Sequence, residues 1–175
     1  MENSNNLYQM RAVTRHIENV PEEWQSTNDW DSHLPAIYLV LLKDKETHPL
    51  AEFGSGHSTQ IINEYCRGHR KFESYENDKE WCVIPSKYVD DYSKVHLMLG
   101  YIVFIDGKPG EERKLLIERY KNNHLLIIHD TEPGADYVYH MSEVLSTFKY
   151  RLDYQPEGKP HTTVVSNTVN VCTWI

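Results

Sequence analysis

Residues 50–59 read Leu50-Ala51-Glu52-Phe53-Gly54-Ser55-Gly56-His57-Ser58-Thr59, an apolar run that reaches an acidic residue, breaks at two glycines and then meets hydroxyls. This order is typical of a buried strand that turns tightly into a helix whose N-terminus faces a small ligand. Glycine suits the turn because a Cβ would block close approach of the backbone. A second acidic strand end, Glu76, follows at the distance expected for the next strand of a βαβ unit. Together the two patterns predict a parallel sheet that binds a small ligand.

Composition limits the kinds of partner. The chain has 175 residues, the length of one domain, and a net charge of -8 without a cluster of basic residues, which argues against a general nucleic-acid binder. The longest apolar run, residues 36–42, is far too short to cross a membrane, and the start of the chain has no pattern of a signal peptide. The three cysteines are scattered without metal spacing, so we expect reduced thiols in a cytoplasmic protein. A small-molecule, sugar or peptide substrate is therefore favoured over nucleic acid or membrane.

Strand and helix patterns alternate along the rest of the chain. Residues 34–42 have helical spacing, with Asp31-Ser32 as the expected N-cap, and residues 101–106 form a buried strand that ends in a carboxylate. The other predicted strands are 49–53, 71–76, 95–99, 125–128, 148–154 and 162–166, and the other predicted helices are 57–67, 78–88, 109–120 and 136–146. This alternation predicts a doubly wound, Rossmann-like α/β fold with a mostly parallel sheet, helices on both faces and an antiparallel C-terminal strand. We expect residues 34–175 to form this domain and residues 1–33 to be an N-terminal extension or lid.

Four predicted strands carry polar residues where they end. These are Glu52 and Gly54, then Glu76, then Asp106, and finally His129 with Asp130. In parallel sheets the ligand binds beyond the carboxyl ends of the strands. The repeated carboxylates therefore indicate a site more than they indicate packing.

The same residues resemble the class I S-adenosylmethionine (SAM) dependent methyltransferases over residues 34–166. Glu52-x-Gly54-x-Gly56 is similar to the first motif of that family, and Glu76 to the acidic residue that ends its second strand. Two short segments are similar to segments that recur in small-molecule and sugar O-methyltransferases: residues 104–107 (Phe-Ile-Asp-Gly) and 127–131 (Ile-Ile-His-Asp-Thr). The resemblance implies a SAM-dependent enzyme that methylates oxygen in a small molecule or sugar.

The resemblance also implies a role for each matching residue. Gly54 and Gly56 would let the backbone approach the methionine part of SAM, with Ser55, His57 and Ser58 in the same loop. Glu52 would hold the methionine ammonium, directly or through water. Glu76 would accept both ribose hydroxyls, Asn77 would border the adenine, and Asp106 would lie beneath the methyl-transfer zone. Because only Gly100 separates the predicted strands 95–99 and 101–106, the helix usual between these strands would be missing and the adenine side altered.

Three residues are candidates for removing the acceptor proton: Asp106, His129 and Asp130. Since side chains alternate along a strand, at most one of the last two points cleanly into the site. Asp130 is preferred for its position, and His129 as a base near neutral pH. Asp106 and Asp130 together would also fit a Mg²⁺ ion, but only Thr131 or Glu132 is near enough in sequence to supply a third oxygen, so a site without metal is favoured.

Two other functions remain open at this level. A degenerate member of the fold could bind an adenosyl nucleotide, or nothing, and act as a protein-interaction module. A nicotinamide-dependent reductase would share the glycines, but it would place Gly or Ala where Thr59 stands. Oligomeric state also remains open, because Trp24, Trp30 and residues 169–175 could pack internally or in a homodimer.

Overall fold

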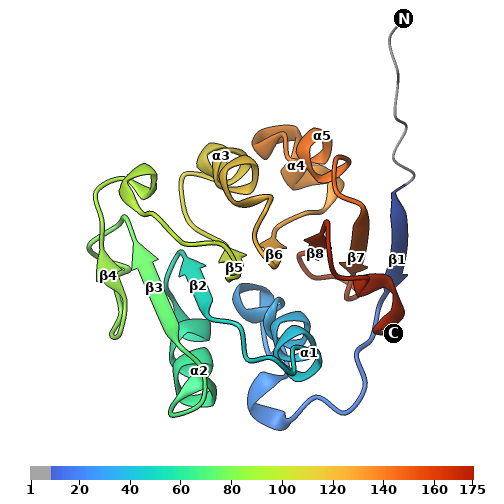
Figure 1. Cartoon of the computed structure of the whole chain (residues 1–175), viewed down its shortest axis with the longest axis horizontal. Helices are drawn as coiled ribbons and strands as arrows, with labels where there is room; N and C mark the ends of the chain where they lie inside the picture. Colours follow the sequence, from blue (N-terminus) through green and yellow to red (C-terminus); the bar gives the residue numbers. More distant parts are fainter. Residues whose placement is uncertain (1–8) are drawn as a thin grey trace, which may run out of the picture.

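A single mixed sheet organises the computed structural model, which describes residues 9–175 (Figure 1). Its eight strands lie in the order β1-β7-β8-β6-β5-β2-β3-β4. Strand β8 runs antiparallel to its neighbours β6 and β7, and the other paired strands are parallel. The strands are β1 (Met10–Thr14), β2 (Leu50–Phe53), β3 (Phe72–Glu76), β4 (Lys87–Tyr88), β5 (Ile102–Ile105), β6 (Leu125–His129), β7 (Tyr150–Tyr154) and β8 (Thr162–Ser166). The predicted fold class, including the antiparallel C-terminal strand, is confirmed.

Helices cover both faces of this sheet (Figure 1). They are α1 (Leu34–Lys43), α2 (His57–Cys66), α3 (Gly110–Tyr120), α4 (Pro133–Tyr139) and α5 (Ser142–Leu145). Strand β5 shows how the layers form: Ile102 and Phe104 join the core beneath α1 and α2, whereas Val103 and Ile105 join the core beneath α3 and α5. All four side chains are fully buried, which is why this strand reads as a continuous apolar run. None of the helices described is long and apolar enough to cross a membrane.

The region between β3 and β5 differs from the prediction. The predicted helix 78–88 is wrong: the segment forms turns and then β4, because Pro85 lacks the N–H that a helix needs and disfavours helical geometry at the residue before it. The predicted strand 95–99 is also wrong, and Met98 and Leu99 are about three-quarters exposed. The third strand of the parallel series is therefore β4, and residues 89–101, with a 3₁₀ turn at Tyr92–Lys94, connect it to β5. The predicted single-glycine connection is therefore wrong, although the segment between β4 and β5 contains a 3₁₀ turn and no α-helix.

Three smaller differences concern element ends. Strand β1 was not predicted; it lies at the sheet edge beside β7, where one short, half-exposed strand leaves little apolar pattern. Asp31-Ser32 does not cap α1, whose N-cap is His33. Asp31 instead ends a 3₁₀ turn, Asp29–Asp31, and its carboxylate accepts the backbone N–H groups of Thr27 and Asn28 at 3.0 Å as part of that turn's capping box. The predicted helix 136–146 is divided into α4 and α5 by His140, which has a left-handed backbone (φ 51°).

Candidate functional site

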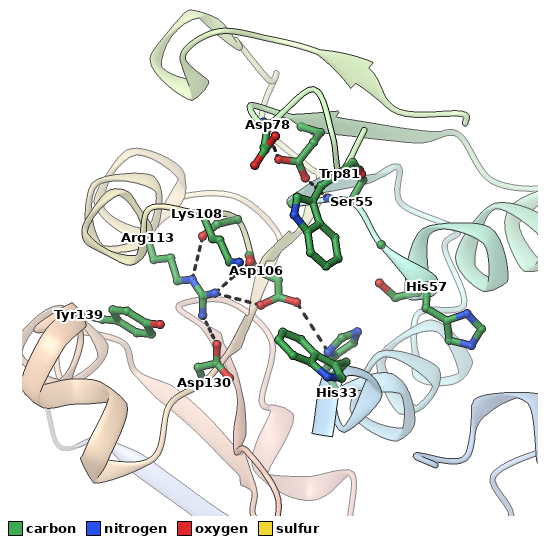
Figure 2. A pocket seen from close by; sticks show the side chains of 16 residues that line it. His33, Ser55, His57, Asp78, Trp81, Asp106, Lys108, Arg113, Asp130 and Tyr139 are labelled. Atoms are coloured by element: carbon green, nitrogen blue, oxygen red, sulfur yellow. Dashed lines mark hydrogen bonds and ion pairs between the residues drawn. The ribbon is translucent and has the colours of Figure 1, made fainter. Parts of the chain in front are cut away.

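A cavity of about 570 Å³ opens at the carboxyl ends of β2, β3, β5 and β6 (Figure 2). Its position is the switch point of the sheet, where β2 and β5 are neighbours and the chain then proceeds outward in both directions. The volume lies within the range of small-molecule sites, about 300–1,000 Å³. The lining comprises Trp30, His33, Gly54, Ser55, Gly56, His57, Ser58, Glu76, Asp78, Trp81, Asp106, Gly107, Lys108, Arg113, Asp130 and Tyr139. Of the residues singled out from sequence, Glu52, Asn77 and His129 do not line it.

The two glycines of the first turn have different reasons to be glycine. Gly54 has φ +99°, and a Cβ there would lie 2.5 Å from the backbone nitrogen of Gly107. Only glycine therefore allows the ends of β2 and β5 to touch at this point. Gly56 has an extended backbone, and a Cβ there would meet no protein atom within 4 Å. Its missing side chain leaves open space on the cavity wall.

Glu52 lies beneath this turn rather than in the cavity. The side chain is fully buried and accepts hydrogen bonds from the hydroxyls of Ser58 (3.2 Å), Thr59 (2.8 Å) and Ser74 (2.6 Å). Burial raises its pKa to about 7, despite these hydroxyl donors. Glu52 thus ties β2 to α2 and β3, and direct contact with a ligand in the cavity is not open to it.

Glu76 reaches the cavity, but the chain's own backbone already uses most of its carboxylate. Oε2 accepts the N–H of Ser55 at 2.6 Å, and Oε1 accepts those of Asn77 and Asp78, both at 2.9 Å. A carboxylate offers about four acceptor positions, so one remains for a ligand hydroxyl. The Asn77 side chain is directed to the neighbouring loop, where its amide donates to the Lys108 carbonyl at 2.6 Å.

Arg113 lies between the two carboxylates at the ends of β5 and β6 (Figure 2). Its guanidinium donates to Asp106 Oδ1 at 3.1 Å and to Asp130 Oδ2 at 2.8 Å, and its side chain is 4% exposed. Burial alone would raise the pKa of Asp106, but His129 and Arg113 outweigh it and hold that pKa well below its usual value. The positive charge that a Mg²⁺ ion would bring to Asp106 and Asp130 is therefore supplied by Arg113. The structure gives no support for the Mg²⁺ site considered for Asp106 and Asp130.

His129 lies behind Asp106, and its hydrogen bonds define its charge. The Ser32 hydroxyl donates to the Pro160 carbonyl (3.2 Å), so it accepts from His129 Nε2 (2.8 Å), while Nδ1 faces the ionised Asp106 at 3.1 Å. Both ring nitrogens are thus donors, as in an imidazolium. Burial lowers the pKa of His129, but the two aspartates outweigh it, and the net shift is upward. In this state His129 holds a proton and has no lone pair for another.

Asp130, in contrast, faces the cavity from a left-handed backbone (φ 54°) directly after β6. This turn places its carboxylate in front of His129, with 3.5 Å between His129 Nδ1 and Asp130 Oδ1. The expectation that only one of the pair points into the site therefore agrees with the geometry. His57 also lines the cavity wall, but its ring points outward (Figure 2).

Sequence reasoning missed two central side chains. In the sequence, Arg113 looks like part of a solvated helix start. Its burial could not be predicted there, because it depends on aspartates at the ends of two strands. His33 is 1% exposed, and within the described chain neither ring nitrogen has a hydrogen-bond partner. Burial, and then the charge of His129, lower the pKa of His33 to about 3, so the ring is neutral. Trp30, also from the N-terminal segment, is 75% exposed at the cavity, whereas Trp24 is buried in the core.

Comparisons with known proteins bear on the fold. No family model and no curated protein sequence matches the chain. A solved structure of the METTL16 MTase domain aligns with 10% identity and a TM-score of 0.50, covering 86% of this chain and 73% of that one. A proposed methyltransferase from Thermoplasma acidophilum aligns with 11% identity and a TM-score of 0.47, covering 69% of each chain. At such identities the similarity concerns architecture alone, and the chain has an α/β fold that resembles the SAM-dependent methyltransferases.

Proposed function

We propose that the protein is a SAM-dependent methyltransferase that methylates oxygen in a small molecule or sugar. The observation that carries the proposal is the cavity at the switch point, where the Gly54 turn, Glu76 and Asp106 meet in a fold of the methyltransferase type. The same three features form the motifs on which the sequence resembles that family.

In this proposal the two ends of SAM contact different walls. The methionine part lies against the turn of residues 54–58, where Gly56 leaves open space. The ribose reaches the one free acceptor position of Glu76. The half-exposed Trp81 offers an aromatic face for the adenine on the same side of the cavity.

Catalysis in this proposal is mainly positioning of the acceptor oxygen for in-line displacement. A neutral hydroxyl gains positive charge as it attacks the methyl group, and preorganised carboxylates stabilise that charge. Asp106 and Asp130 each give one oxygen to Arg113, which leaves Asp106 Oδ2 and Asp130 Oδ1 for the acceptor. One of these two carboxylates would then take the proton, while the protonated His129 keeps Asp106 ionised.

A second candidate function is a degenerate member of the fold that binds an adenosyl nucleotide weakly or acts as an interaction module. The observation that favours it is that three backbone N–H groups already occupy most of the acceptor positions of the Glu76 carboxylate. A ribose diol would normally need two acceptors from this residue.

Isothermal titration calorimetry with SAM, its demethylated product and NADH, each with and without Mg²⁺, tests the proposal. Micromolar binding of SAM or its product, unaffected by Mg²⁺, is expected. Glu76→Gln should weaken that binding and also lower the melting temperature, because it turns one acceptor of buried backbone N–H groups into a donor. The matched exposed variant Glu118→Gln on α3 should change neither. Binding of none of the three would favour the module, and binding of NADH alone would favour a reductase.

The setting of the reaction is part of the proposal. Cys66, Cys82 and Cys172 are free thiols, which fits a reducing, cytoplasmic environment. The cavity volume of about 570 Å³ suits a small acceptor, and the net charge of -8 argues against nucleic acid.

A further inference from the structure

We propose that His33, Asp106 and His129 bind a divalent transition-metal ion of the zinc type at the inner wall of the cavity. One nitrogen of each histidine and one carboxylate oxygen of Asp106 all lie within 4.8 Å of one another. Two imidazoles with one carboxylate are a ligand set that suits zinc, iron or cobalt, and three protein ligands leave coordination positions open. The set differs from the oxygen pair first considered for Mg²⁺, and it does not depend on SAM binding.

His33 is the residue that requires an explanation. Its ring is buried between Phe104 and His129, with ring centroids 4.9 and 4.5 Å away, and neither nitrogen has a partner within residues 9–175. A buried polar nitrogen without a partner costs about 1–3 kcal/mol. Nδ1 lies 3.9 Å from Asp106 Oδ2, so this nitrogen faces the cluster. A metal ion between these two atoms would satisfy it.

His129 is oriented as a metal ligand would be. Metal-binding histidines usually donate their second N–H to an oxygen that holds the ring in place. Here Nε2 is bonded to the Ser32 hydroxyl at 2.8 Å, which leaves Nδ1 directed at Asp106. Nδ1 would have to lose its proton to the solvent as the ion binds, so binding should release about one proton.

Charge balance connects the ion with the proposed reaction. Arg113 and the protonated His129 at present neutralise Asp106 and Asp130. Replacing the His129 proton by a divalent ion leaves one net positive charge. If the proposed methyl transfer is correct, an acceptor oxygen in an open coordination position would be favoured in its ionised form, because it restores neutrality.

A second histidine cluster offers a contrast within the same molecule. Asp44, His48 and His124 also meet the distance limit. Like Asp106, Asp44 is bonded to a guanidinium, that of Arg70 at 2.6 Å, and to a histidine, His48 Nδ1 at 2.7 Å, so the two clusters differ in the unpartnered nitrogens of His33. No buried nitrogen of these two histidines is left without a partner, so this cluster is a control and not a second site.

The test is a titration of the metal-free full-length protein with Co²⁺, followed by visible absorption and by proton release, without SAM. We expect one bound ion at micromolar affinity, released protons near one per ion, and loss of both signals in His33→Phe, which preserves a ring in the buried position. His57→Ala, at the cavity wall, and His48→Ala, in the second cluster, should bind as the unaltered protein does. Circular dichroism should confirm that each variant is folded.

The outcomes separate this inference from the proposed function. Absence of Co²⁺ binding, or equal binding by the folded His33→Phe variant, would overturn the metal site and leave SAM binding untouched. Co²⁺ binding that depends on His33 supports the site even where SAM does not bind.

Discussion

Replacing Arg113 with methionine should destabilise the protein strongly, because the guanidinium is the buried counter-charge of two aspartates. Its nitrogens donate five hydrogen bonds, to Asp106 Oδ1, to Asp130 Oδ2 and to the carbonyls of Asp106, Gly107 and His129. The guanidinium side chain is only 4% exposed, so it makes these contacts largely away from water.

The magnitude follows from removing one partner of a buried ion pair, which costs about 3–5 kcal/mol. For a chain of this length each kcal/mol lowers the melting temperature by about 2–4 °C, so Arg113→Met should melt roughly 6–20 °C lower. Urea unfolding followed by tryptophan fluorescence measures the free energy directly. Arg113→Lys should fall between, since an ammonium has three donors for the five acceptors.

Two further variants make the reasoning refutable. Arg67 forms an exposed pair with Glu64, with side chains 70% and 67% exposed, so Arg67→Met should cost less than about 1 kcal/mol. Adding Asp130→Asn to Arg113→Met should recover part of the lost stability, because one unpaired carboxylate is neutralised. A loss below about 1 kcal/mol for Arg113→Met, or additive effects of the two substitutions, would contradict the role given to Arg113.

Three other outcomes are expected. Gly54→Ala should lower the free energy of unfolding by about 3 kcal/mol or more, since its Cβ meets the Gly107 backbone; thermal melting measures this. Gly56→Ala should leave the melting temperature unchanged but weaken SAM binding in calorimetry, and unchanged affinity would show that no ligand approaches there. The pKa of Glu52 rises from 4.5 to about 7 on folding, so stability present below pH 4.5 should decline by about 3 kcal/mol as the pH rises to 7. Glu52→Gln should remove this decline, and a profile that persists in the variant would refute the assignment.

The prediction succeeded where local periodicity and burial coincide, and failed where they do not. Strand β5 is covered on both faces, so its apolar run identifies it without knowledge of its neighbours. Residues 95–99 have a similar apolar content, but Val95 is the buried one among them and Met98 and Leu99 are about three-quarters exposed, and nothing in five residues distinguishes this segment from β5. Strand β1 is the reverse case. Its sequence has no strand pattern, and it is extended because it pairs with the edge of β7.

By itself the sequence determined the alternation of strands and helices, the glycine turn and the carboxylates at strand ends, because each depends on neighbours within a few residues. The fold class and the place of the cavity follow from these local features. Only the tertiary structure decided the charges and the side-chain contacts of the site. Arg113, His33 and Ser32 reach Asp106 and His129 from distant segments, and burial then sets which of these groups are charged. Desolvation and pairing are properties of the folded interior, and no spacing along the chain encodes them.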